Sequence, residues 1–211
     1  MDNPIRAAEG SAVDRAALAG RIQTVTGIID AAEMGLTLAH EHILIDAMFM
    51  YVEPKLAGQQ AFAHQKINLR NIGWVRYNWT QNLDNVQLFD ENTAVSELQH
   101  FRAAGGRTIV DPTNIGLGRD PEGLARVSRL SGVQIVMGSG HYLAVTHPAD
   151  VRERSEESIA EEIVADVRGG GGTTARPPSG RWRRRRRRGA RCGSCTRPCR
   201  CETETTPCSA P

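Results

Sequence analysis

Residues 35–46 read GLTLAHEHILID, and this stretch decides the fold class. Its apolar side chains fall on both faces of an extended segment, which is typical of a strand buried inside a parallel sheet. They are Leu36, Leu38, Ile43, Leu44 and Ile45. We therefore predict one buried strand from Leu36 to Ile45, with His40 and His42 near its carboxyl end.

Strand and helix signals alternate around this stretch. Further strands are predicted at Ile22–Ile29, Arg107–Asp111 and Val133–Gly138, and helices at Asp90–Ala104, at Asp120–Leu130 and from Ser155 to about Val167. The segment 46–88 is too long for a plain turn, and loops of that length are usually lids or binding loops. Three strand-then-helix units after a short first strand are typical of the N-terminal portion of a TIM (β/α)₈ barrel. This α/β fold needs about 200 to 250 residues to close.

The chain changes character at Gly169. Residues 1–168 contain 22 acidic and 15 basic side chains, whereas residues 169–211 contain 11 arginines, two glutamates and no Ile, Leu, Val, Met, Phe or Tyr. Such a segment cannot build an apolar core, so we expect a disordered tail rich in Arg, Gly and Cys. Its composition is also that of a GC-rich gene translated out of frame. The expected parts are a flexible N-terminus at 1–20, a partial barrel domain at 21–168 and the tail at 169–211.

All five cysteines lie in the tail. Cys192 and Cys195 have the two-residue spacing of a zinc site, but no second well-spaced pair and no histidine follow, so we predict no zinc site there. The run Arg183–Arg188 would bind phosphate backbones through counterion release without reading bases. Non-specific nucleic acid is therefore an expected partner of the tail.

The sequence offers no membrane partner. It has no run of about 18 apolar residues, and residues 1–20 lack the continuous apolar core of a signal peptide. We expect a cytoplasmic protein.

His40 and His42 form the candidate metal site. On a strand, residues two apart point to the same side, so both imidazoles would project together while Glu41 faces the other way. Two imidazoles at that separation can share one ion, and active sites form at the carboxyl ends of barrel strands. Neutral imidazole suits zinc, which lowers the pKa of bound water toward about 7. The alternative is that both are only polar residues at a strand end.

The sequence motifs around this pair resemble those of the phosphotriesterase family in the amidohydrolase superfamily. The resemblance starts with Thr24–Ile28 (TVTGI) and residues 35–46. It continues through Glu97–Leu98, Gly105–Asp111, Gly118–Pro121, Gly138–Tyr142 and His147–Pro148. These stretches run in order from about Gln23 to Arg168, and the resemblance explains nothing of the tail.

The resemblance implies a zinc-dependent hydrolase on a (β/α)₈ barrel. Such an enzyme cleaves phosphotriesters, lactones or related small-molecule esters with a metal-bound hydroxide, and the family is often homodimeric. His40 and His42 correspond to the pair that holds the more buried metal. Tyr142 matches a position that lines the substrate pocket, although it would equally suit a loop aromatic packed on the barrel rim. Asp111 is either a carboxylate behind the metal ligands or simply a strand end, and we prefer the strand end.

The resemblance also shows what this chain does not match. In the family, a bridging lysine or glutamate comes from the fourth strand, two histidines from the fifth and sixth, and a catalytic aspartate from the eighth. We therefore expect no catalytic residue in this chain, one weak partial zinc site and no activity of the chain alone. Three hypotheses follow. The first, which we prefer, is a truncated hydrolase with an out-of-frame tail. The second is a metalloenzyme subunit completed by a partner chain, and the third is a nucleic-acid-binding protein that uses its arginine run.

Overall fold

The computed structural model of the protein describes residues 19–169. The predictions for residues 1–18 and for the tail beyond residue 169, which include Arg183–Arg188 and the cysteines, lie outside the described residues. The strands are β1 Arg21–Thr24, β2 Gly27–Asp30, β3 Leu36–Leu38, β4 Ile45–Asp46, β5 Gln87–Leu88, β6 Gly106–Asp111 and β7 Gln134–Met137. The helices are α1 Ala57–Ala63, α2 Ile72–Tyr77, α3 Glu91–Ala103, α4 Pro121–Ser131 and α5 Glu156–Gly169, with short 3₁₀ turns between several elements.

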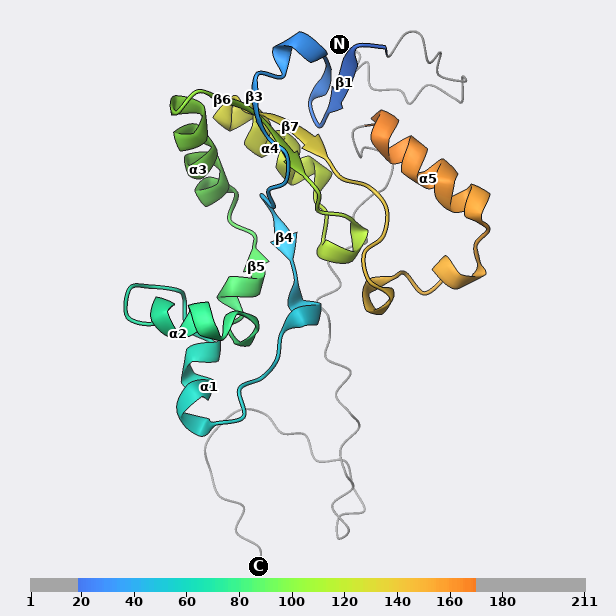
Figure 1. Ribbon diagram of the computed structural model, residues 1–211. Coiled ribbons are helices and arrows are strands. Elements are labelled where there is room, and N and C mark those ends of the chain that lie inside the picture. The colour runs from blue at the N-terminus through green and yellow to red at the C-terminus, as the bar shows by residue number, and fades with distance from the viewer. Residues whose placement is uncertain (1–18, 170–211) are drawn as a thin grey trace, which may run out of the picture. The chain divides into compact units, whose positions relative to one another are not determined.

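A parallel three-stranded sheet organises the described chain (Figure 1). Its strand order is β3-β6-β7, and both neighbouring pairs are parallel. Helix α3 precedes β6 and helix α4 precedes β7, so a helix connects each strand of the sheet to the next. The predicted α/β class with parallel strands is thereby confirmed.

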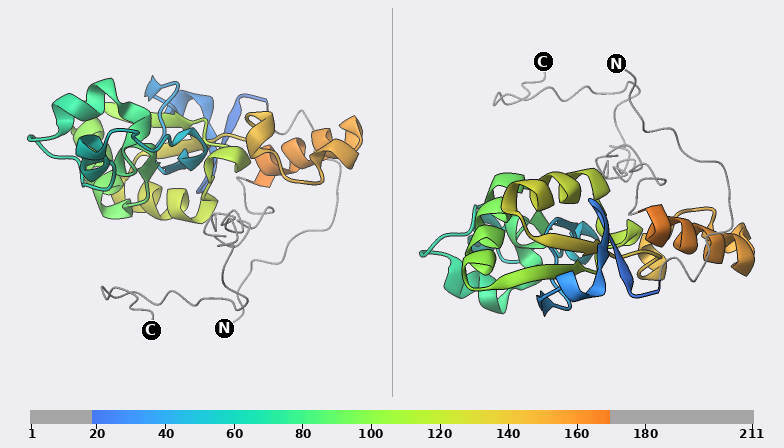
Figure 2. Two further views of the ribbon diagram at one scale, coloured as in Figure 1. Left: turned by 90° about the horizontal axis from the view of Figure 1, so that it is seen from below. Right: turned by 90° about the horizontal axis from the view of Figure 1, so that it is seen from above.

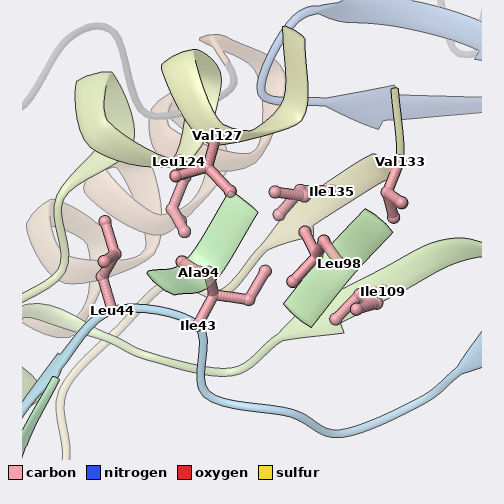
Figure 3. Close-up of a cluster of buried hydrophobic side chains, with 9 residues drawn as sticks. All are labelled: Ile43, Leu44, Ala94, Leu98, Ile109, Leu124, Val127, Val133 and Ile135. Carbon is pink, nitrogen blue, oxygen red and sulfur yellow. The ribbon is translucent and has the colours of Figure 1, made fainter. Parts of the chain in front are cut away.

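The main core lies between this sheet and two helices (Figure 3). Ala94 and Leu98 of α3 pack with Leu124 and Val127 of α4, and the same cluster includes Ile109 of β6 and Ile135 of β7. The last two side chains are cross-strand partners in the parallel register. Because both helices meet these neighbouring side chains, α3 and α4 cover the same face of the sheet.

The predicted strand Ile22–Ile29 is wrong, because β1 and β2 form an antiparallel hairpin instead. The hydroxyl of Thr24 donates to the carbonyl of Gly27 at 2.7 Å and closes the turn. Gly27 has φ of 137°, a conformation that side-chain-bearing residues rarely adopt. The hairpin lies beside β7 (Figure 2), and the N–H of Val25 donates to the carbonyl of Ile135 at 2.9 Å.

The predicted strand Leu36–Ile45 is also wrong as one continuous buried element. The chain leaves the sheet after Leu38 and pairs again only as β4, which is antiparallel to β5. Leu36 and Leu38 are 62% and 40% exposed, whereas Ile43 and Leu44 are buried in the helix-covered core. The first apolar residues of this run therefore lie exposed on β3, and later ones pack into the core after the chain has left the sheet.

The predicted helices agree with α3, α4 and α5, whereas the segment 46–88, predicted as one long connection, contains α1, α2 and β5. Asp90 accepts a hydrogen bond from the N–H of Asn92 at the start of α3, and Asp120 accepts one from the N–H of Gly123 at the start of α4. The hydroxyl oxygen of Ser155 accepts one from the N–H of Ser158 in α5. Within residues 19–169, every helix is too short or too polar to cross a membrane.

Candidate metal centre

His40 and His42 follow the carboxyl end of β3, next to the carboxyl end of β6. The N–H of Glu41 donates to the carbonyl of Val110 at 3.0 Å, so this segment still runs alongside β6 although it is no longer a regular strand. The two imidazole rings lie edge to face with centroids 5.5 Å apart. The structure thus brings together the two side chains that the sequence singled out.

The two rings differ in their surroundings. His40 is exposed to solvent, whereas the side chain of His42 is 30% exposed. The Nδ1 atom of His42 lies 2.8 Å from the hydroxyl oxygen of Thr113, which is fully buried. The ring of His42 is therefore fixed by its contact with Thr113, whereas the exposed ring of His40 contacts that of His42.

Asp111 anchors the segment that carries His42. Its fully buried carboxylate accepts the N–H of Thr113 at 2.8 Å and the N–H of Ile43 at 3.2 Å. One oxygen of the same carboxylate lies 3.9 Å from Nδ1 of His42. Asp111 is the last residue of β6, as preferred above, and it is also a carboxylate directly behind the candidate ligand.

A cavity of about 890 Å³ opens beside this segment. Glu41 and His42 contribute to its wall, together with apolar side chains from α3 and β6 such as Leu98, Phe101 and Ile109. Cavities of this size with a mainly apolar lining and a few polar groups are typical of small-molecule sites. The imidazole of His42 therefore borders a space that a small molecule can enter.

Tyr142 lies in the loop after β7. Its side chain is 44% exposed, and its ring meets the ring of Phe49 edge to face at a centroid distance of 5.8 Å. Phe49 belongs to the turn that follows β4. The contact joins the loop after β7 to the segment that leads away from His42.

A second group of polar side chains lies between the same loop and α5. His141 is 10% exposed at its side chain, and Nε2 lies 3.8 Å from a carboxylate oxygen of Glu162. That carboxylate also pairs with Arg154, and the ring of His147 lies 5.6 Å from that of His141. Among residues 19–169, no group of three or more His, Cys, Asp or Glu side chains is placed to hold a metal ion. Neither this group nor the His40 and His42 pair is a complete metal site in that part of the chain.

Thr113 was not predicted as a site residue from the sequence. Its signal was weak but present, because Thr113 stands two residues after Asp111 at the end of a predicted strand. Carboxyl ends of neighbouring parallel strands meet at one edge of a sheet, so residues just after two such strands are expected to be neighbours. The order of the strands, which the sequence does not state, is needed to apply that rule.

Comparison with known proteins shows which family the sequence matches. The model of the phosphotriesterase family matches residues 20–176. An N-acetyltaurine hydrolase of Dictyostelium discoideum is 36% identical over 69% of this chain and 45% of its own length. The N-acetyltaurine hydrolase of Homo sapiens is 32% identical over 71% of this chain and 43% of its own length.

A solved structure gives the same picture. The crystal structure of a resiniferatoxin-binding protein from Rhodobacter sphaeroides superposes with a TM-score of 0.70 at 40% identity, and the match covers 74% of this chain and 44% of that one. The chain thus spans less than half the length of each of these relatives.

Proposed function

This chain belongs to the phosphotriesterase family, and we propose that residues 19–169 are the first part of a (β/α)₈ barrel hydrolase in which His40 and His42 hold a divalent metal ion, zinc first. The parallel order β3-β6-β7 with α3 and α4 between the strands supports the barrel. The position of both histidines after the carboxyl end of β3 supports the site, because barrel enzymes assemble their active sites at that end.

The pairing of the two imidazoles is the observation that carries the proposal. Their centroids are 5.5 Å apart, and Nδ1 of His42 is already engaged by Thr113. Nε2 of His42 makes no hydrogen bond that is recorded within residues 19–169, and it is the ring atom that we assign to the ion. Imidazole nitrogen is a preferred zinc ligand, and the residues present therefore fit the metal.

The chemistry divides between the ion and the protein. A divalent ion bound there acts as a Lewis acid toward a carbonyl or phosphoryl oxygen and makes water more acidic. His40 and His42 hold it, while Asp111 keeps the His42 segment in place through the N–H groups of Ile43 and Thr113. Tyr142, which lies against Phe49, would contact the substrate.

The substrate we propose is a small molecule with an ester or amide bond to an acyl or phosphoryl group. The family resemblance supports phosphotriesters and lactones, and the name N-acetyltaurine hydrolase of several relatives adds the amide bond of an acylated amine. Two imidazoles supply half of a tetrahedral zinc set. We therefore propose that this chain binds zinc weakly. Turnover would need further metal ligands, supplied either by the later strands of the family's barrel or by a partner chain.

Zinc titration of the full chain tests the site. We expect His40→Ala and His42→Ala each to abolish the same single zinc-binding event. His64→Ala, which changes an exposed histidine at the end of α1, should bind zinc like the wild type. Any zinc bound by the five cysteines after residue 169 would be common to all four proteins and would not affect the comparison. Equal binding by the wild type and His42→Ala contradicts the site.

Turnover assays test whether the metal centre of this chain lacks ligands that catalysis needs. With zinc or cobalt, we expect the full chain to hydrolyse a paraoxon-like triester, a lactone and N-acetyltaurine no faster than buffer does. Metal-dependent turnover that a chelator abolishes, and that His42→Ala lacks, would show that this chain completes the centre by itself.

A further inference from the structure

The ring of His42 is held through one nitrogen only. Nδ1 lies 2.8 Å from the hydroxyl oxygen of Thr113, and the residues are 71 positions apart in the chain. Either partner can donate at such a distance, since both a hydroxyl and an imidazole nitrogen can act as donor or acceptor. The surroundings of Nδ1 therefore decide which nitrogen of the neutral ring carries the proton.

The carboxylate of Asp111 favours the tautomer with the proton on Nδ1. One of its oxygens lies 3.9 Å from Nδ1 of His42, and the carboxylate is fully buried, so its charge acts with little screening by water. A proton on Nδ1 presents the positive end of an N–H dipole to this charge. The other tautomer would present a lone pair to it, which is unfavourable.

The same carboxylate holds both chain segments in register. It accepts the N–H of Thr113 and the N–H of Ile43, the residue directly after His42. The hydroxyl and the ring that meet at 2.8 Å are thus tied to one buried group from both sides. Within residues 19–169, no hydrogen bond from β6 to the ring of His40 is recorded, and this exposed ring lies edge to face with that of His42.

We propose that Thr113 and Asp111 are positioning residues that keep the proton of His42 on Nδ1 and leave the Nε2 lone pair free for the metal ion. The inference rests on the proposed function for the identity of the ligand atom, but the tautomer is a property of the metal-free chain. Metal-binding histidines generally donate their other ring N–H to an oxygen of the protein, and changes at such partners cost about 10- to 100-fold in metal affinity.

The tautomer is measured directly by ¹⁵N NMR of the metal-free full chain labelled at histidine, at mildly alkaline pH. Loss of one signal set in His42→Gln assigns His42 among the six histidines. We expect the wild type to show the pattern of a ring protonated at Nδ1. Thr113→Ser keeps this pattern, whereas Thr113→Val shifts the ring toward protonation at Nε2.

Zinc titration of the same proteins gives the second readout. We expect Thr113→Val to weaken the histidine-dependent binding by about 10- to 100-fold and Thr113→Ser to bind like the wild type. Thr146→Val is the matched control, because its hydroxyl donates to the carbonyl of Leu143 in the loop after β7 and does not touch His42. Circular dichroism checks that each variant is folded.

The outcomes separate this inference from the proposed function. If the wild type shows His42 protonated at Nε2, the inference is wrong whether or not zinc binds. If Thr113→Val keeps both the Nδ1 tautomer and the wild-type affinity, Thr113 does not position the ring, and the inference is again wrong. If no histidine-dependent zinc binding is found in the wild type, the proposed function fails, and the effect of Thr113→Val on the tautomer alone decides the inference. Should Thr113→Val not fold, the wild-type tautomer still decides it.

Discussion

At the scale of single residues, Gly118 is a position where the chain tolerates a side chain poorly. Its φ is +74°, and a Cβ added there would lie 2.8 Å from Cβ of Asp46. The carboxylate of Asp46 in turn accepts the N–H of Met48 at 3.0 Å. The turn before α4 therefore packs closely, at Gly118, against the segment that follows His42.

We expect Gly118→Ala to lower the free energy of unfolding by about 1–3 kcal/mol, because the left-handed conformation strains a residue with a side chain. Gly73→Ala is the control, since it lies within α2 and a Cβ there meets nothing within 4 Å. That change is expected to be neutral or slightly stabilising. Urea denaturation of both variants is the measurement, and equal stability of the two would refute the expectation.

The same scale explains which site residues the sequence could predict. His40 and His42 are two positions apart, so their proximity follows from local geometry alone. Thr113 lies 71 positions from His42, and its contact depends on β6 lying next to β3. Asp111 was recognised as a strand end, but its hydrogen bonds to Ile43 and Thr113 depend on the same strand order.

At the scale of elements, the start of α3 gives a pH prediction. The side-chain hydrogen bond from Thr93 and the N–H of Asn92 hold the pKa of Asp90 below its usual value of 3.8. The hydrogen bond from Arg126 of α4 likewise lowers the pKa of Glu91. A carboxyl group with a lowered pKa in the folded state contributes stability above its usual pKa and loses it as the pH falls through the lower, folded value.

We therefore expect the thermal midpoint to fall as the pH drops below about 4, and Asp90→Asn to reduce this slope. Asparagine also caps helices, so the variant keeps the acceptor for the N–H of Asn92 but has no titrating group. Glu97→Gln, which changes an exposed carboxylate on the same helix, is the control and should leave the slope unchanged. An unaltered slope in Asp90→Asn would count against the role of this cap.

The attachment of α5 depends on a buried ion pair. Arg119 donates to Asp166 of α5 at 2.6 Å, and the two side chains are 2% and 0% exposed. The hydroxyl of Ser139 donates to the same carboxylate at 2.8 Å. Removing one partner of a buried pair takes a counter-charge away from the charge that stays buried, which costs about 3–5 kcal/mol.

We expect Asp166→Asn to destabilise the chain by about that amount and Arg119→Met combined with Asp166→Leu to recover part of it. The exposed pair of Arg126 and Glu91 is the comparison, because such pairs are screened by water. Arg126→Met should therefore cost much less. A double-mutant cycle read by urea denaturation checks both expectations, and additive effects of the Arg119 and Asp166 changes would argue against a coupled pair.

Elements with local signals were predicted well from the sequence. Capping residues mark the starts of α3, α4 and α5, and the short apolar runs gave β6 and β7. The segment from Leu36 to Ile45 was not predictable in this way, because Ile43 and Leu44 are buried against the helices and not within the sheet. The pattern of apolar residues predicts that these side chains are buried, but it does not show which neighbours bury them.

At the scale of the whole molecule, β3 is the vulnerable edge of the described part. It lies at the end of the order β3-β6-β7, and no strand among residues 19–169 pairs with its other side. Leu36 is 62% exposed on this strand, and Leu38 is 40% exposed. Open strand edges with apolar side chains are templates for pairing with another chain.

We therefore expect the full chain to self-associate as its concentration rises, and Leu36→Lys to suppress this, because a charged side chain on an edge strand opposes edge-to-edge pairing. Leu69→Lys is the matched control, since Leu69 is 95% exposed but lies in the connection before α2, outside any strand. Both variants add the same charge and remove the same side chain, so net charge and overall hydropathy do not distinguish them. Size-exclusion chromatography with light scattering over a concentration series gives the mass of each. If Leu69→Lys lowers the mass as much as Leu36→Lys does, the association comes from general surface hydrophobicity and not from the edge of β3.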